Sequence, residues 1–319
     1  MSTIATPIRT EPATRPNPIL RKTTRQAAAA VLLAAMLPAL TGCASLFISK
    51  RKLLQPIPPS IVQSASADDL VAQLNAKWSK FQSLTATVDI RASHLKQKEG
   101  VATDYPSFRA NLLLRAPEML RILGKLPLVQ TTMFDLGSDG KTFTLTIPPK
   151  NKAYTGENNN KGTSPNWYEN LRPAPFFSAM VVRGLEPEEL YSVTSDSSTE
   201  EDPATKRLRL HPEYVLNVQR RKPGSQQLYP VRVVTFRRED LQPYEQDLYD
   251  DSGVLQTQVI YRNYRDFDGV RYPSQITMKR PQEEYQLVMT VERVNQNTPL
   301  SDDQFQVKIP EGMPVTHLH

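Results

Sequence analysis

The sequence predicts a mostly β protein, a single half-open antiparallel β-barrel with a few lid helices. Two observations lead to this prediction. Six runs of alternating apolar and polar residues follow residue 82, and such alternation is typical of strands with one apolar face. Turn signals separate the runs without long helical crossovers, so we expect antiparallel pairing. About ten one-faced strands must curl around either a closed core or a cavity capped by helices.

Residues 1–42 are predicted to be a lipoprotein signal peptide. Five basic residues and one acidic residue precede an apolar run from Ala27 to Leu40. This run is shorter than the roughly 20 residues that a membrane-spanning helix needs. The segment Leu40-Thr41-Gly42-Cys43 resembles the bacterial lipobox. The resemblance implies that Cys43 is lipidated, and Ala44 after it favours a periplasm-facing anchor in the outer membrane. The alternative is a buried free cysteine after an N-terminal helix.

Residues 43–65 are predicted to be the lipidated cysteine and a linker. Pro56, Pro58 and Pro59 stiffen this segment, and the basic residues 50–52 either are solvated or touch anionic headgroups. Most of the formal net charge of +6 lies in the first 42 residues. The nearly neutral remainder has no strong electrostatic reason to bind nucleic acid. Residues 66–319 then form one predicted domain, because no repeat or boundary divides them.

The domain is predicted to begin with a helix over residues 67–82. Leu70, Leu74, Trp78 and Phe81 recur at helical spacing, and Ser66 is placed to cap the first turn. An amphipathic helix normally buries its apolar stripe. We therefore expect this stripe to pack against the sheet rather than to bind a ligand.

The strands follow the helix. Their apolar positions are Leu84, Ala86, Val88, Ile90 and Ala92; Phe108, Ala110, Leu112 and Leu114; Phe143, Leu145 and Ile147; Tyr214, Leu216 and Val218; Leu255, Thr257, Val259 and Tyr261; and Tyr285, Leu287, Met289 and Val291. Asp139-Gly140, Pro223-Gly224, residues 251–253 and Asp268-Gly269 provide the turn signals. Residues 156–206 interrupt this pattern with a predicted polar loop over 156–165, a short helix over 176–182 and an acidic loop over 194–203.

Catalytic motifs are absent from the sequence. It has no nucleophile elbow, phosphate-binding glycine loop or zinc-protease motif. His94 and His211 cannot be paired from sequence, and His317 and His319 are expected to lie in a frayed terminus. The carboxylate pairs at 188–189 and 283–284 are expected to be solvated charges. We therefore expect no enzyme, cofactor or metal site, although distant strands could still assemble a site.

A family resemblance begins at residues 121–136. Two strand-like pieces flank Pro127-Leu128, and Asp139-Gly140, Ala153-Tyr154-Thr155 and residues 182–185 follow. This order resembles LolB-like outer-membrane lipoprotein receptors. It implies that Leu126, Leu128 and Val129 form a loop that inserts into the membrane, with Val129 standing where that family has glycine. The alternative is that Leu126 and Leu128 tuck under the barrel rim.

The C-terminal part resembles the wider LolA/LolB-like lipoprotein-carrier superfamily. The segments that carry this resemblance are residues 267–273, Pro299-Leu300-Ser301-Asp302 and Pro310-Glu311-Gly312. It implies a monomeric carrier whose partners are outer-membrane lipid, lipoprotein acyl chains and a periplasmic carrier. The side chains that either line its apolar cavity or fill the barrel are Phe108, Leu112, Phe143, Leu145, Tyr261, Tyr285 and Leu287. A filled barrel would instead favour a non-transporting envelope lipoprotein with a scaffold, stress-sensing or partner-binding role.

Overall fold

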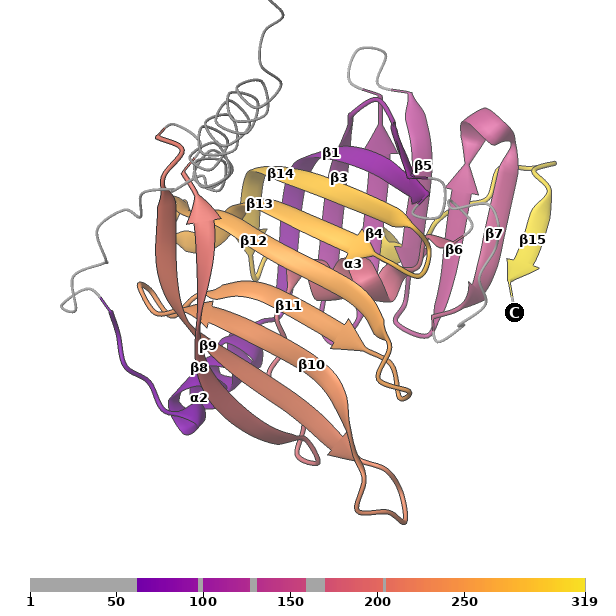
Figure 1. Ribbon diagram of the computed structural model, residues 1–319. Helices are drawn as coiled ribbons and strands as arrows, with labels where there is room; N and C mark the ends of the chain where they lie inside the picture. Colours follow the sequence, from indigo (N-terminus) through magenta and orange to yellow (C-terminus); the bar gives the residue numbers. More distant parts are fainter. Residues whose placement is uncertain (1–61, 97–99, 127–130, 159–169, 203–204, 319) are drawn as a thin grey trace, which may run out of the picture.

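The computed structural model describes residues 62–96, 100–126, 131–158, 170–202 and 205–318 (Figure 1). The predicted signal peptide and Cys43 lie outside these residues, as do Leu128, Val129 and His319. Within the described chain, a single 15-stranded sheet forms, antiparallel except at one edge. This architecture confirms the predicted fold class of a mostly β, half-open antiparallel sheet.

The strands follow one another along most of the sheet. They are β1 (Ser83–Lys96), β2 (Val101–Asp104), β3 (Phe108–Arg115), β4 (Met119–Lys125), β5 (Thr132–Ser138), β6 (Thr142–Ile147), β7 (Lys152–Glu157), β8 (Leu190–Glu201), β9 (Leu208–Arg221), β10 (Leu228–Arg237), β11 (Pro243–Tyr249), β12 (Leu255–Phe267), β13 (Val270–Arg280), β14 (Tyr285–Gln296) and β15 (Val315–Leu318). Their order is β15-β7-β6-β5-β4-β3-β1-β14-β13-β12-β11-β10-β9-β8, and β2 pairs with β1. Because β8 and β15 do not pair with each other in this sheet, it stays open.

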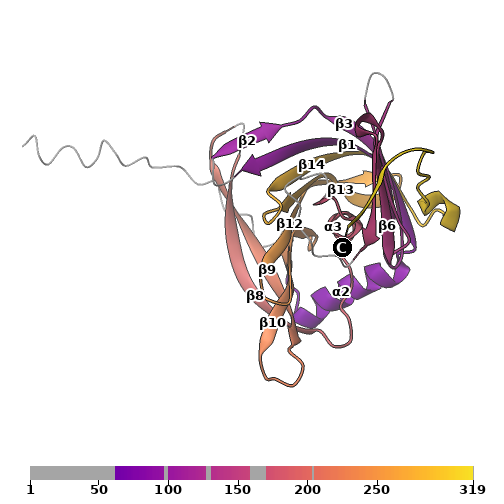
Figure 2. The same ribbon diagram turned by 90° about the vertical axis from the view of Figure 1, so that its right-hand side faces the viewer.

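Two α-helices cover the concave side of the described sheet. Figure 2 shows the sheet curving around α3 (Pro173–Met180), while α2 (Ala67–Lys80) lies across the open side. A capping box starts α2 as predicted: the Ser66 hydroxyl accepts from the Asp69 amide at 3.1 Å, and the Asp69 carboxylate accepts from the Ser66 amide at 2.8 Å. Short 3-10 helices, η2 (Pro148–Lys150) and η4 (Asp302–Phe305), complete the described helical structure.

Buried side chains form two apolar clusters that α2 connects. The larger cluster joins Phe81 and α3 to most of the concave face of the sheet. The smaller cluster packs Leu70, Val71 and Leu74 of α2 against β9 and β10. The helical stripe predicted from sequence is therefore a packing face that holds the β8–β10 wing against the rest of the concavity.

The last residues before α2 are attached to the sheet. The Gln63 amide donates to the Arg238 carbonyl at 2.7 Å, and the Ala65 amide donates to the Tyr214 hydroxyl at 3.3 Å. The end of the predicted linker thus runs along the β9–β10 wing, close to its turns.

Two predictions about connecting segments were wrong. The acidic loop expected at 194–203 is largely strand β8, which pairs with β9 from Leu190↔Gln219 to Glu201↔Leu208. The sequence does not reveal this strand because both faces of an exposed edge strand are polar, so no alternation marks it.

His317 was also expected to be frayed, but it lies in β15, and its Nδ1 is 2.6 Å from the Thr155 hydroxyl oxygen.

Candidate functional site

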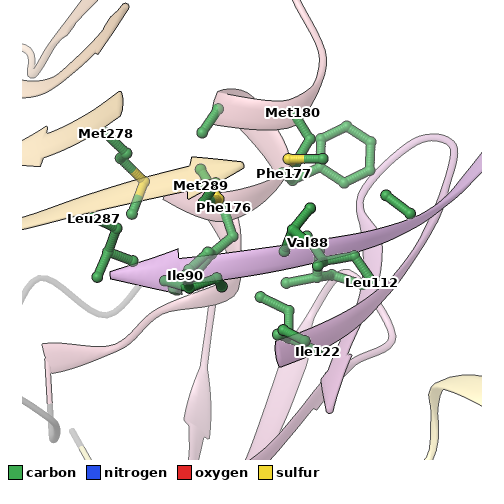
Figure 3. Close-up of a cluster of buried hydrophobic side chains, with 14 of the residues drawn as sticks. Val88, Ile90, Leu112, Ile122, Phe176, Phe177, Met180, Met278, Leu287 and Met289 are labelled. Carbon is green, nitrogen blue, oxygen red and sulfur yellow. The ribbon is translucent and has the colours of Figure 1, made fainter. Parts of the chain in front are cut away.

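The centre of the concavity is filled by α3. Phe176, Phe177 and Met180 are almost fully buried, and Figure 3 shows them against the side chains of β1, β3, β13 and β14. Phe177 packs edge-on against Trp78 and Phe81, with ring centroids 6.5 and 6.3 Å away. The space available to a ligand therefore lies beside α3 rather than in place of it.

A cavity of about 400 Å³ lies beneath the C-terminal half of α2. It is formed by α2, the residues that follow α3, and the facing ends of β11, β12 and β13. Its principal side chains are Trp78, Phe81, Met180, Val182, Tyr261, Tyr264, Val270 and Tyr272, with Lys77, Lys80 and Arg271 among the polar ones. The volume falls within the range of about 300–1,000 Å³ found for small-molecule sites, as does the mostly apolar lining.

Three tyrosines in this cavity differ in their hydroxyl contacts. The Tyr264 hydroxyl donates to the Pro243 carbonyl at 2.7 Å, and the Tyr272 hydroxyl donates to the Met180 carbonyl at 2.6 Å. The Tyr261 hydroxyl is buried and has no hydrogen-bond partner among the described residues. Burial raises the pKa of Tyr261 well above its ordinary value, so this group stays a neutral O–H. A buried donor without a partner is costly, and a ligand acceptor would relieve that cost.

The sheet opens beside Tyr261. Strands β11 and β12 pair from Glu245↔Ile260 to Tyr249↔Leu255, whereas β12 continues to pair with β13 as far as Phe267. Residues 243–244 and 261–264 therefore face each other without a backbone ladder between them, and we call this gap the seam. Asn263, with a φ of 55°, lies within it.

A polar cavity of about 240 Å³ lies at the seam and shares residues with the larger cavity. The residues common to both are Gln242, Pro243, Tyr261, Tyr264 and Arg271. The guanidinium carbons of Arg237 and Arg262 lie 3.8 and 3.7 Å from the ring centroid of Tyr244. Since each arginine directly follows a buried aromatic residue on its strand, it points to the opposite, convex face. The seam thus lies between an apolar space on one face and a space lined by arginines and carboxylates on the other.

The arginines at the seam have only partial carboxylate compensation. Arg237 donates to Glu200 at 2.8 Å, and Arg262 lies 3.8 Å from the same carboxylate. Arg271 lies 3.8 Å from Asp240. Burial opposes ionisation of Glu200, but the hydrogen bond from Arg237 and the charges of Arg237, Arg262 and His211 together outweigh it and lower the pKa of Glu200. Five basic and two acidic side chains line the two cavities, so the described site has an excess of positive charge.

A separate apolar pocket of about 130 Å³ lies between α3 and strands β1, β3, β5, β6 and β14. It is lined by Ile90, Ala92, Phe108, Met133, Phe134, Ile147, Lys150, Leu171, Phe176 and Leu287. Apart from Lys150 these side chains are apolar, so the pocket suits a short hydrocarbon segment.

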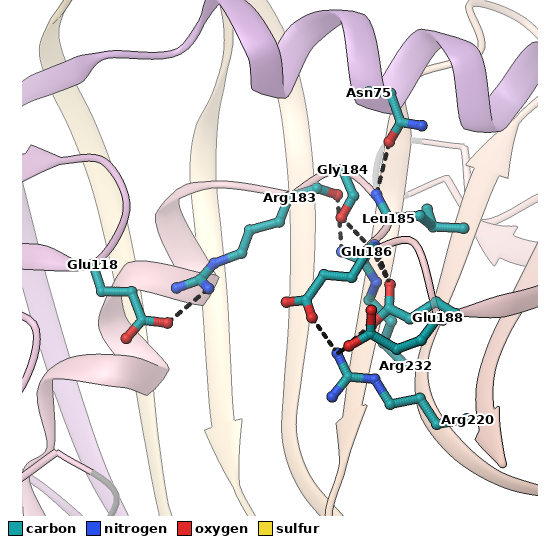
Figure 4. A network of polar contacts seen from close by, with 10 residues as sticks. Asn75, Glu118, Arg183, Gly184, Leu185, Glu186, Glu188, Arg220 and Arg232 are labelled. Carbon is teal, nitrogen blue, oxygen red and sulfur yellow. Dashed lines mark hydrogen bonds and ion pairs between the residues drawn. The ribbon is translucent and has the colours of Figure 1, made fainter.

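A buried polar network holds the segment that passes under α2. Arg232 donates to the carbonyls of Arg183 and Gly184 at 2.8 and 2.5 Å, and Asn75 of α2 accepts from the Leu185 amide at 2.7 Å (Figure 4). A Cβ atom on Gly184 would lie 2.7 Å from the Asn75 side-chain oxygen, so only glycine allows this approach. The network fixes α2, and with it one wall of the larger cavity.

The predicted site residues fall into three groups. Phe108 and Leu287 line the small apolar pocket, and Tyr261 lines both the larger cavity and the seam. Four others pack within the larger core cluster: Leu112, Phe143, Leu145 and Tyr285. Leu126 is half-buried, and its amide donates to the Thr131 carbonyl at 3.0 Å.

Two carboxylates predicted to be solvated are buried instead. Glu189 lies 3.5 Å from the buried Arg232, and Glu283 forms an ion pair with Arg280. Sequence reasoning missed these pairs because each partner comes from outside the acidic doublet. It also missed Arg237, Arg262 and Arg271, which adjoin apolar strand positions but carry no local motif.

Two absences apply to the described residues. In the ranges that the structure describes, no helix combines the length and apolarity needed to cross a membrane. The same ranges contain no group of three or more His, Cys, Asp or Glu side chains placed to hold a metal ion.

Comparisons with known proteins give a family match and several structural similarities. A family model described as an uncharacterised protein matches residues 190–309. No curated protein matches the chain. A LolA superfamily protein from Nitrosomonas europaea is 13% identical, with a TM-score of 0.45, and covers 76% of this chain and 99% of its own.

Two further solved structures show similarity of the same order. A putative outer membrane lipoprotein-sorting protein domain from Vibrio parahaemolyticus is 15% identical, with a TM-score of 0.46 over 75% of this chain and 95% of its own. A DUF1329 family protein from Desulfovibrio piger is 16% identical, with a TM-score of 0.45 and the same coverage.

Proposed function

We propose that the protein is an outer-membrane lipoprotein that binds acyl chains in the concavity of its sheet and carries or inserts lipid or lipoprotein. The cavity of about 400 Å³ beneath α2 carries this proposal. Its aromatic and aliphatic side chains offer apolar surface to a hydrocarbon chain, and each buried methylene contributes about 0.8 kcal/mol. A chain of several methylenes would therefore bind there without any catalytic group.

The proposed anchor is Cys43, exposed as the N-terminus after removal of residues 1–42. Two or three acyl chains hold a protein at a membrane far more firmly than one. We expect the wild-type protein to sediment with membranes after carbonate extraction and the Cys43→Ala variant to be released. A variant that still sediments would contradict the lipid anchor without touching the cavity.

The proposed handover surface is the loop containing Leu126, Leu128 and Val129. An apolar loop is costly in water and useful at a bilayer. A Leu128→Glu variant should fold normally and fail to complement a deletion strain. Full complementation would remove the insertion role and leave acyl binding to be judged separately.

A second candidate is a non-transporting envelope lipoprotein, and the packing of α3 favours it. Phe176, Phe177 and Met180 occupy the centre of the concavity, as a filled barrel requires. Native mass spectrometry of Cys43→Ala protein, purified without detergent, separates the two candidates. Co-purifying lipid or acyl-peptide mass supports carriage, whereas an apo mass with no uptake of added fatty acid supports the second candidate.

A further inference from the structure

The two cavities that meet at Tyr261 have complementary chemistry. The space beneath α2 is lined by aromatic and aliphatic side chains, with Lys77 and Lys80 on its α2 side. The space at the seam is lined by Arg237, Arg262 and Arg271, with Glu200 and Asp240 as the acidic side chains. A ligand that filled both would have an apolar part in the first and an anionic part in the second.

We propose that the ligand is an amphiphile with an anionic headgroup, whose chain lies beneath α2 and whose head lies at the seam. This inference rests on the proposed acyl-binding function and specifies the ligand class. Tyr261 lines both cavities. Its hydroxyl is buried and has no partner in the described structure, and we infer that it donates to the head when the ligand enters. Two arginines stacked on Tyr244, together with Arg271, supply the positive charge.

The contrast between the hydroxyl groups of three neighbouring tyrosines supports a ligand-binding role for Tyr261. Tyr264 and Tyr272 line the same cavity and each reaches a backbone carbonyl. No described acceptor satisfies the Tyr261 hydroxyl, and an acceptor brought by a ligand would do so. A hydrogen bond to a charged acceptor is stronger than one to a neutral acceptor, which favours a phosphate or carboxylate.

The inference also distinguishes between two kinds of lipid cargo. The modified cysteine of a triacylated lipoprotein carries an amide at its N-terminus and therefore no charge there. Fatty acids and phosphate-bearing lipids keep their negative charge. We infer that the seam favours anionic lipids over the triacylated end of a lipoprotein.

Binding of three probes with the same twelve-carbon chain tests this directly. Dodecyl phosphate, dodecanoate and dodecanol are titrated below their aggregation limits into the purified Cys43→Ala protein, with displacement of a fluorescent fatty acid as the readout. We expect the better anion to bind about tenfold more tightly than dodecanol. The relative affinities of phosphate and carboxylate then show which headgroup the seam prefers.

The outcomes separate the inference from the proposed function. Equal binding of all three probes would overturn the anionic headgroup and leave acyl binding intact. Binding of none would overturn acyl binding itself. Binding of dodecanol in preference to both anions would also contradict the inference.

Variants at the seam provide an independent test. Tyr261→Phe should lower the affinity for the preferred anion about tenfold and leave dodecanol binding unchanged. Because the Tyr261 hydroxyl has no partner, this variant should be at least as stable as the wild type. Tyr264→Phe, which removes a bonded hydroxyl, should be less stable and serves as the matched stability control.

A charge variant completes the design. Arg271→Gln should weaken anion binding and make the affinity less dependent on salt concentration. Arg109→Gln, which removes a partly exposed ion pair with Glu292 elsewhere on the sheet, should bind the anion as the wild type does. If Tyr261→Phe and Arg271→Gln both retain the full preference for the anion, the headgroup does not lie at the seam.

Discussion

At the scale of single residues, we expect the loss of Arg232 to lower the free energy of unfolding more than the loss of an exposed charged side chain. Its side chain is 7% exposed, and it faces a Glu189 side chain that is 4% exposed. It also satisfies two carbonyls of the segment beneath α2. Buried ion pairs are not inherently stabilising, but removing Arg232 would leave the two carbonyls without their donor and the buried Glu189 with only Arg220, 3.2 Å away.

The first prediction follows from this asymmetry. Arg232→Met should lower the free energy of unfolding by about 3–5 kcal/mol, measured by urea denaturation. Arg109→Met, which breaks the partly exposed pair with Glu292, should cost less than about 1 kcal/mol. Equal losses in the two variants would show that burial of Arg232 does not decide its contribution.

A second prediction at this scale concerns two carboxyls on β11. Burial, followed by the charge of Asp247, raises the pKa of Glu245, and burial raises the pKa of Asp247. The folded protein therefore holds protons that the unfolded chain has already released. Consequently the free energy of unfolding should fall as the pH rises above the ordinary pKa values of 3.8 and 4.5.

The measurement is urea unfolding across acidic and neutral pH. A Glu245→Gln/Asp247→Asn double variant should lose much of this decline, while Glu311→Gln, at an exposed position, should keep it. If the double variant declines as steeply as the wild type, these two carboxyls are not the source of the pH dependence.

At the scale of elements, α2 connects the two clusters and forms a wall of the larger cavity. Its capping box provides a direct way to weaken the helix without touching either cluster. Ser66→Ala should cost about 1 kcal/mol of unfolding free energy. Ser64→Ala, two residues earlier and exposed, should change it by less than about 0.5 kcal/mol. A loss of the same size in both variants would place the effect outside the cap.

The elements also show which parts of the fold were predictable from sequence. Strands with one buried face, such as β3 and β14, can be recognised from the sequence because buried and less buried positions alternate along them. Strand β8 cannot be recognised in this way, since its stability comes from the backbone hydrogen bonds with β9 rather than from an apolar face. The short helix predicted over 176–182 is observed over Pro173–Met180, because both prolines lie within the helix and proline suits a first helical turn.

The site was less predictable than the fold. Tyr261 was a cavity candidate from its strand position alone, but its lack of a partner depends on where β11 separates from β12. That separation is set by long-range pairing and by Asn263, whose positive φ no local pattern indicates. Arg237 and Arg262 come together only because both reach the same tyrosine ring from different strands.

At the scale of the whole molecule, the concavity is a packed hydrophobic core with small remaining cavities rather than one large open cavity. The ring of Phe176 separates the small apolar pocket from the rest of the cluster and is 1% exposed. Removing it should therefore both destabilise the protein and create a cavity.

Phe176→Ala tests this description. We expect a loss of about 3–5 kcal/mol, together with stabilisation by added benzene, because dry apolar cavities bind such molecules. Tyr105→Ala, at an exposed position, should show neither effect. If the alanine variant does not fold, Phe176→Leu gives a smaller cavity; absence of benzene stabilisation in a folded variant would mean that the core collapses around the gap.

The pairing of β15 with β7 at one edge of the sheet affects the order in which the strands form during folding. β15 lies parallel to β7, pairing Val315 with Ala153 and Leu318 with Gly156. The paired residues Thr155 and His317 are 162 positions apart in the sequence, so the pairing of β15 with β7 closes a long loop. Loop closure over such a separation is slow. Until it occurs, β7 presents an uncovered backbone edge, which makes this interval of folding the period of greatest exposure to mispairing and to quality-control proteases.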